Sequence, residues 1–275
     1  MNDVVLPELP RGRQKKRPSW EVQRAVIFAL MVRDMRSRVS GQWISFIWTL
    51  FVPLAHALVL VWAMAVLRGI TRDHLEYPVF LVAGLVPFFF FQDIVTRLLD
   101  AIESSRGLYA YRQVKPIDAL VARALVEALM VLLVYLVCLG ILGWMGYHVI
   151  PHDPLGLVIS NAMLFLFGLF AGIYLAVLSH DRPRMGKVIR MTFMPLYFFS
   201  GIFFNVDSLP RPLIEPLLWN PLLHLVELAR SAMISAYVPS QGINPWYPML
   251  WIVGLAFSGL LLYRAKQQQL MTTQG

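Results

Sequence analysis

The sequence predicts an all-α integral membrane protein with six transmembrane helices and both termini on the cytosolic side. Hydrophobic residues make up 58% of the 275-residue chain and charged residues only 15%, well below the roughly one quarter that is typical of soluble domains. The mean hydropathy is +0.62. Of the 24 Lys and Arg residues, the outer segments of this topology hold only Arg68, Arg72, Arg211 and Arg230. That asymmetry is what the positive-inside rule requires of a chain with cytosolic ends.

Two segments precede the first long apolar run. Residues 1–18 are rich in proline and basic residues, and we expect a disordered tail that lies against anionic headgroups. Nucleic-acid binding is the alternative for such a tail, but no folded reading surface accompanies it. Residues 19–42 predict an interfacial amphipathic helix with Ser19 as its N-cap, because the apolar run 25–32 is far shorter than the ~20 residues that cross a bilayer. The simpler alternative is the cytosolic start of the first span.

Six apolar runs carry the predicted spans. They cover residues 43–67, 78–99, 119–145, 155–178, 188–204 and 246–263. Trp43, Trp48 and Trp62 bracket the first run near the two membrane interfaces. Gly168 and Gly172 give the fourth run a face that lets a neighbouring helix approach closely. The fifth run is the shortest, and a proline and a glycine interrupt it.

Charged and polar residues are few within these runs. Asp93 and Arg97 are four residues apart, as are Arg123 and Glu127, and this spacing places each pair on one helical face. Salt bridges within each helix are the simplest expectation, and a functional alternative places Arg97 at the mouth of an anion path. His56 has no second ligand near it in the chain, and we interpret it as a packed or pore-facing residue rather than a metal ligand.

A polar, mixed-charge segment, residues 100–115, joins the second and third runs on the predicted cytosolic side. Leu108, Tyr109 and Tyr111 give it an apolar side, and Ser104 and Ser105 fit the cap of a short helix. Our central hypothesis is that this segment leaves the bilayer and docks into a partner that supplies energy. The simpler alternative is a solvated loop between helices.

Two segments are assigned to the outer face. Residues 205–245 are apolar but repeatedly broken by proline, and the longest piece, 222–236, contains Glu227 and Arg230. We expect short re-entrant or interfacial helices here, because broken backbone at membrane depth must be shielded by protein or line a cavity. The segment 146–154 holds two histidines among prolines, and we interpret it as a turn rather than a metal site.

The sequence carries no catalytic motif. It has no phosphate loop of an ATPase and no zinc-protease or hydrolase motif. The spans hold few central carboxylates, which argues against a proton relay. Six spans with a docking segment therefore indicate a transport subunit rather than an enzyme.

Three stretches resemble the membrane subunits of the ABC-2 class of ATP-binding-cassette exporters, in the polysaccharide-export branch. They are RDMRSR at 33–38, FLVAGLVPF at 80–88, and PLYFFSGIFF at 195–204 followed by LWNPL at 218–222 and by His224. The resemblance runs from about Trp20 to Tyr263. Within the branch, the chain is most similar to the inner-membrane permeases of Gram-negative group 2 capsule exporters, and O-antigen exporters share much of the pattern.

The resemblance implies a homodimeric channel in the bacterial inner membrane, with two copies of a separate cytosolic ATPase that binds the ATP and Mg. This chain itself would hold no cofactor and bind no nucleic acid. Segment 100–115 would carry the coupling helix that enters a groove on the ATPase. The residues expected at that contact are Glu103, Ser104, Arg106, Leu108, Tyr109 and Arg112. The substrate would be a lipid-linked acidic polysaccharide, passed on to periplasmic co-polymerase-like and outer-membrane export proteins.

An acidic glycan needs cations at the inner mouth of its path, and sugar rings slide well along aromatic faces. The candidate cations are Arg33, Arg36, Arg38, Arg97, Arg184 and Lys187. The candidate aromatic residues are Phe88, Phe91, Phe193, Tyr197, Phe198 and Phe203. The alternatives are that the cations only anchor the chain on the cytosolic side and that the rings only pack against lipid.

Two further functions remain open. One is ABC-2 export of a small hydrophobic molecule, which would need no wide cationic path. The other is an integral-membrane enzyme that acts on lipid-linked sugars, against which the lack of a catalytic cluster argues.

Overall fold

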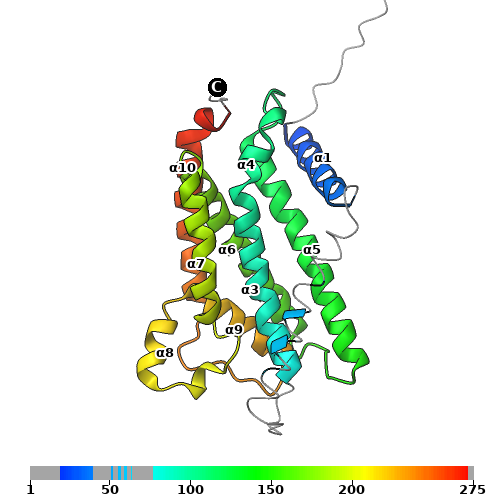
Figure 1. Ribbon diagram of the computed structural model, residues 1–275, viewed down its shortest axis with the longest axis vertical. Helices are drawn as coiled ribbons and strands as arrows, with labels where there is room; N and C mark the ends of the chain where they lie inside the picture. The colour runs from blue at the N-terminus through cyan, green and yellow to red at the C-terminus, as the bar shows by residue number, and fades with distance from the viewer. Residues whose placement is uncertain are drawn as a thin grey trace, which may run out of the picture.

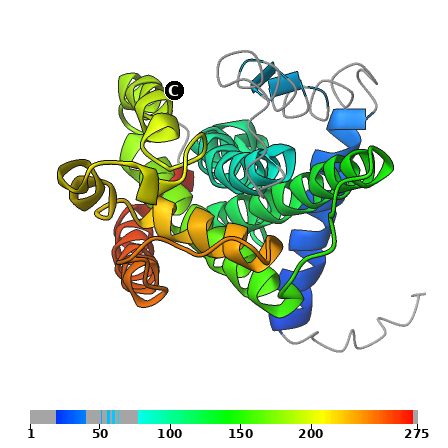
Figure 2. The same cartoon turned by 90° about the horizontal axis from the view of Figure 1, so that it is seen from below.

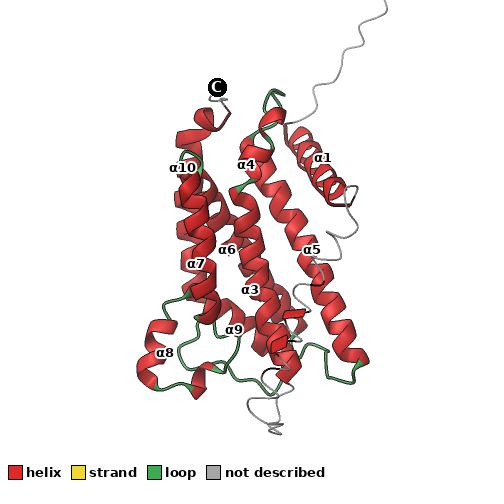
Figure 3. Ribbon diagram, in the orientation of Figure 1, coloured by secondary structure: helices red, strands yellow, loops and turns green. Residues whose placement is uncertain are grey.

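The computed structural model describes residues 19–39 and 77–271, with six single positions between them: Phe51, Ala55, His56, Val59, Leu60 and Ala63. Within this part of the chain every regular element is a helix (Figure 3). The helices are α1 (Ser19–Val39), α3 (Tyr77–Leu99), α4 (Ala101–Ser104), η1 (Arg106–Leu108), α5 (Pro116–Trp144), α6 (Pro154–Ser179), α7 (Pro183–Phe198), η2 (Val206–Ser208), α8 (Arg211–Leu217), α9 (Pro221–Met233) and α10 (Trp246–Met271).

The long helices α3, α5, α6, α7 and α10 form one bundle (Figure 1). At one end of the bundle lie α1, which packs on α5, together with α4 and the C-terminal end of α10. At the opposite end lie α8 and α9, and α9 crosses beneath the bundle (Figure 2). We call these the inner and the outer end. The elements that the sequence assigns to the cytosolic side thus gather at the inner end, and the proline-broken region lies at the outer end.

Four of the described helices are long and apolar enough to cross a membrane: α3, α5, α6 and α10. They correspond to the predicted second, third, fourth and sixth runs. Residues 265–275 are predicted to be a cytosolic tail, but α10 continues as a helix into this range, as far as Met271. The fifth run differs, because α7 spans only 16 residues and ends before the turn at Gly201, whose φ is 66°. The basic tail and most of the first run lie outside the described residues. The six-span topology therefore stays a prediction.

Local sequence explains where these helices start. Proline occupies the first turn of α5, α6, α7 and α9, where its missing N–H leaves no helical bond unmade. The side chains of Asp153 and Asn220 each accept a hydrogen bond from a backbone N–H in the first turn of α6 and α9. Helix α1 begins at Ser19, so this residue lies within the helix rather than capping it as predicted. The interfacial position of α1 stays a prediction.

Helix α3 is the centre of the bundle. It packs against α5, α6 and α9, and 78% of its most apolar stretch is buried, compared with 22% for α10. Gly168 and Gly172 on α6 lie against Ile94 and Leu98 of α3, so the predicted close approach through small residues is confirmed. The proline-broken region forms η2 and two short helices, α8 and α9. Their short length is as expected, and their re-entrant or interfacial position stays a prediction.

The contact between α3 and α6 gives a first prediction. A Cβ atom at Gly172 would lie 2.8 Å from Leu98 Cδ2 and 3.2 Å from Leu98 Cβ. Gly172→Val should therefore overpack this contact and lower the free energy of unfolding by about 1–3 kcal/mol. Gly140→Val is the matched control, because a Cβ there meets nothing within 4 Å. Denaturant unfolding in detergent measures both, and equal effects would contradict the packing account.

Candidate functional site

Segment 100–115 folds into α4 and η1 at the inner end, between α3 and α5 (Figure 1). The Tyr109 hydroxyl donates to the Ile102 carbonyl oxygen at 3.2 Å and closes the segment on itself. Ser105 stands at the C-cap of α4 and the N-cap of η1, as predicted for one of the two serines, but its side chain makes no capping hydrogen bond. The Ser105 hydroxyl instead accepts a hydrogen bond from Arg33 of α1 at 3.1 Å. The segment is thus an ordered feature that is tied to α1.

The six residues predicted to touch an ATPase divide into two groups. Glu103, Ser104 and Arg112 are exposed, and Glu103 pairs with the half-buried Arg106 at 2.7 Å. Leu108 and Tyr109 are half-buried, and Leu108 packs with α1 and α5 in a small apolar cluster. The first group forms an outward surface and the second holds it in place. The contact with an ATPase stays a prediction.

A network of ion pairs holds α1 on α5. Asp34 of α1 is buried and pairs with Arg38 at 3.1 Å and with Arg123 of α5 at 3.2 Å. Glu127 of α5, whose side chain is 3% exposed, pairs with Arg38 and, at 3.4 Å, with Arg97 of α3. Each carboxylate therefore has two cationic partners, which offsets the cost of removing it from water. We call these five residues the inner network.

The inner network corrects two expectations. Arg97 pairs with Glu127 rather than with Asp93, and Arg123 pairs with Asp34 rather than with Glu127. Asp34 and Arg38 of α1 do pair at the spacing of four residues. Arg97 and Arg123 instead each reach a buried carboxylate on a neighbouring helix.

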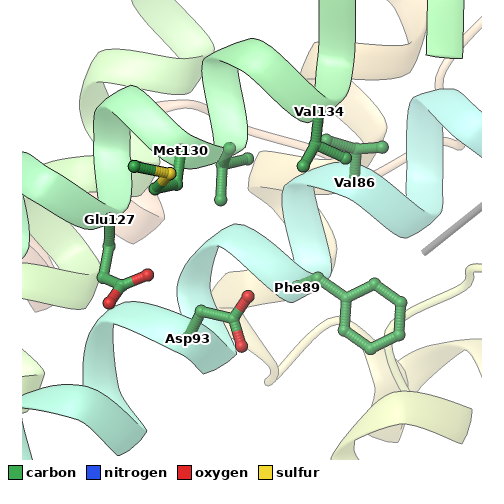
Figure 4. A pocket seen from close by; sticks show the side chains of 7 residues that line it. Val86, Phe89, Asp93, Glu127, Met130 and Val134 are labelled. Carbon is green, nitrogen blue, oxygen red and sulfur yellow. The ribbon is translucent and has the colours of Figure 1, made fainter. Parts of the chain in front are cut away.

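Asp93 faces a small cavity between α3 and α5 (Figure 4). Its volume is about 20 Å³, roughly the space for one water molecule. Glu127 points toward the same cavity, and the other lining residues are apolar. The Asp93 carboxylate makes no hydrogen bond or ion pair with the described residues, although its backbone carbonyl oxygen accepts from the Thr96 hydroxyl at 3.3 Å. The cavity places two carboxylates together beside the inner network.

The predicted path cations have different positions. Arg33 and Arg38 bind within the inner end, and Arg97 is half exposed while it pairs with Glu127. Arg36, Arg184 and Lys187 are exposed, the last two on the first turns of α7. Four of the six predicted cations, these three and Arg97, are thus exposed at the protein surface.

Sequence reasoning missed two links at the inner end. Arg190 of α7 donates to both Asp100 carboxylate oxygens at 2.7 Å, which joins α7 to the end of α3. Lys266 of α10 pairs with Asp181 at 2.6 Å, and its hydrogen bond lowers the pKa of Asp181. No spacing rule reveals such pairs, because their members lie 90 and 85 residues apart.

The predicted path aromatics separate into a buried and a surface group. Phe88, Phe91 and Phe193 are buried in the helix packing, and Phe91 stacks on Phe167 with ring centroids 4.8 Å apart. These three rings therefore have almost no exposed surface with which this chain could contact a polysaccharide.

Tyr197, Phe198 and Phe203 form a partly exposed cluster at the outer end of α7. The centroid of Phe203 lies 4.8 Å from Tyr197 and 5.7 Å from Phe198. His56 packs edge-on against Tyr197, consistent with its interpretation as a packed residue. We call these three α7-end rings the aromatic cluster.

The two histidines of the outer turn do not form a metal site with described residues. Asp153 beside them caps α6 by accepting from the Gly156 N–H at 2.9 Å. Across residues 19–39 and 77–271, no group of three His, Cys, Asp or Glu side chains is placed to hold a metal ion.

Comparison with known proteins gives a consistent result. Residues 25–234 match the ABC-2 type transporter family. The polysialic acid transport protein KpsM of Escherichia coli is 36% identical over 257 residues, covering 94% of this chain and 99% of the relative. The capsule polysaccharide export inner-membrane protein CtrC of Neisseria meningitidis is 26% identical over 88% of this chain and 92% of its own length. Its counterpart BexB of Haemophilus influenzae is 24% identical over 77% and 80%.

The inner network gives a second prediction. Glu127→Gln removes the shared carboxylate, so Arg97 loses its ion-pair partner and Arg38 keeps only Asp34. The free energy of unfolding should fall by about 1–3 kcal/mol, between the values for exposed and fully buried pairs, since Arg38 is partly exposed. Hydrogen exchange should also speed up in α1 more than in α6. Glu103→Gln, whose carboxylate side chain is 61% exposed, is the control and should change neither quantity.

Proposed function

The chain belongs to the ABC-2 type transporter family, and on that premise we propose that it is the permease through which an ATP-driven exporter moves a lipid-linked acidic capsular polysaccharide across the bacterial inner membrane. The observation that carries this proposal is the 36% identity to KpsM over nearly the full length of both chains. That relative is named for polysialic acid, a polymer of acidic sugars, and CtrC and BexB are named for capsule polysaccharide export.

In this proposal, segment 100–115 contacts the ATPase and transmits its conformational changes to the bundle. The chain has no phosphate loop, so ATP and Mg would bind to two copies of a separate cytosolic subunit beneath a homodimer of this chain. Arg33 ties the segment to α1, and Arg190 ties Asp100, the first residue of the segment, to α7. A displacement of the segment would therefore reach α1 and α7 together, and the inner network would pass it to α5.

Helix α7 is our candidate for a wall of the polysaccharide path. Its inner end presents the exposed Arg184 and Lys187, which suit an acidic polymer. Its outer end presents the aromatic cluster, on which sugar rings can stack. Periplasmic co-polymerase-like and outer-membrane partners would receive the polymer at that end, and both termini would lie in the cytosol.

A test of the coupling segment uses the ion pair between Glu103 and Arg106. The double variant Glu103→Arg with Arg106→Glu keeps a pair within the segment but reverses its outward charges. Affinity purification of the tagged chain in mild detergent should recover an ATPase with the native chain and much less with the double variant. Arg211→Glu at the outer end is the control and should recover the native amount.

Two other outcomes of that purification are informative. Equal recovery with both chains would keep the transporter but place the docking surface elsewhere. If a well-folded sample recovers no ATPase, the exporter proposal fails and an enzyme acting on lipid-linked sugars becomes the leading alternative.

A test of the substrate class uses the exposed cations of α7. The double variant Arg184→Ser with Lys187→Ser should reduce the acidic polysaccharide that reaches the cell surface by several-fold and raise the amount retained inside, because the path loses two charges. Arg211→Ser, which removes an exposed cation at the outer end, should leave export unchanged. Unchanged export in the double variant would favour a small hydrophobic cargo instead.

A further inference from the structure

Arg230 is a cation enclosed completely within the outer end of the bundle. Its side chain is 0% exposed and pairs with Glu227, also 0% exposed, at 2.8 Å. The second carboxylate oxygen of Glu227 accepts from the Tyr237 hydroxyl at 2.6 Å. The guanidinium carbon also lies 3.8 Å from the centroid of Phe80 on α3, a close cation–π contact. A charge with these surroundings cannot contact a substrate, so any role of Arg230 must act through residues of its own chain.

A glycine on α3 makes room for this guanidinium. A Cβ atom at Gly84 would overlap the Arg230 Nη2 atom, and it would lie 3.5 Å from the Ile202 Cα. Gly84 is therefore a notch into which one arm of Arg230 fits. The fit joins three elements at one point: α9, which carries Arg230, α3, which carries the notch, and the turn that follows α7.

Two further hydrogen bonds from Arg230 hold that turn. Nη1 donates to the Gly201 carbonyl oxygen at 3.1 Å, and Nη2 donates to the Ile202 carbonyl oxygen at 3.3 Å. The next residue is Phe203, a member of the aromatic cluster, whose own carbonyl oxygen accepts from the Tyr77 hydroxyl at 3.3 Å. The backbone on the N-terminal side of Phe203 is thus fixed by Arg230.

We propose that Arg230, seated in the Gly84 notch, is a positioning residue for export, which fixes the turn after α7 and thereby sets the aromatic cluster against the polysaccharide path. This inference rests on the proposed function, since only a sugar polymer gives the aromatic cluster its role. The planar fork of Arg matters here, because it reaches Glu227 and two carbonyl oxygens at once, whereas a Lys ammonium at the same depth is a single point charge.

The test compares Arg230→Lys, Gly84→Ala and the double variant, each purified with its ATPase. Arg230→Lys keeps the charge, but one ammonium group cannot reach the Glu227 carboxylate and the two carbonyl oxygens of the turn together. Polysaccharide export should fall about tenfold, while ATP hydrolysis continues. Hydrogen exchange should accelerate in residues 198–205 and stay unchanged in α5 and α6. Gly254→Ala on α10, where a Cβ meets nothing within 4 Å, is the control.

The double variant tests the notch itself. Lys has no second terminal nitrogen to meet the new Cβ, so Gly84→Ala should add little to the defect of Arg230→Lys, although it is damaging alone. If the export defects of the two single variants instead multiply in the double variant, the proposal that Gly84 makes room for Arg230 is wrong. Full export by Arg230→Lys, or exchange that accelerates equally in every helix, would overturn the positioning role.

The exchange measurement needs no substrate, so it separates this inference from the proposed function. If the native chain exports no acidic polysaccharide but Arg230→Lys still loosens residues 198–205 alone, the proposed function fails and the anchoring of the turn stands. If the native chain exports the polymer and the turn is unaffected by Arg230→Lys, the positioning role fails and the proposed function stands.

Discussion

The buried carboxylate of Glu127 is the constraint on which the inner end depends. A charge with a 3% exposed side chain inside an apolar bundle is tolerated only when cations surround it. Two cations reach Glu127, one from α1 and one from α3. The position of α1 on the bundle is therefore a condition for satisfying Glu127, and Arg33 extends the same dependence to segment 100–115. Paired charges therefore link α1, α3 and α5 at the inner end.

The outer end meets the same problem with the opposite sign of charge. There the buried group is a guanidinium, and its partners are a carboxylate, two backbone carbonyl oxygens and an aromatic face. Backbone carbonyls are available because the chain leaves helical geometry after α7, at Gly201. The irregular backbone that a bilayer would otherwise penalise is thus satisfied from within the protein. One charge joins the broken region to the central helix.

Much of the helical framework was predictable from the sequence, because apolar length, proline and capping residues act locally. The bounds of α3, α5 and α6 follow the predicted runs within a few residues. The ion pairs were not predictable, since Arg123 and Asp34 are 89 residues apart and spacing on one helix carries no information about another. The aromatic residues show the same limit. Phe88 and Phe198 read alike in the sequence, but the first is fully buried in α3 and the second is 52% exposed on α7.

The burial of most of α3 has a consequence for how the surrounding lipid acts on the bundle. A bilayer that is too thin or too thick for a helix acts through the lipid that touches it, by tilting or stretching the contact. Helix α10, with most of its surface outward, receives that force directly, whereas α3 is sheltered by its neighbours. Both anchors described above, Glu127 through Arg97 and Arg230 through Gly84, end on this sheltered helix. We therefore expect changes in lipid composition to act on the peripheral helices more than on α3 and the two anchors that end on it.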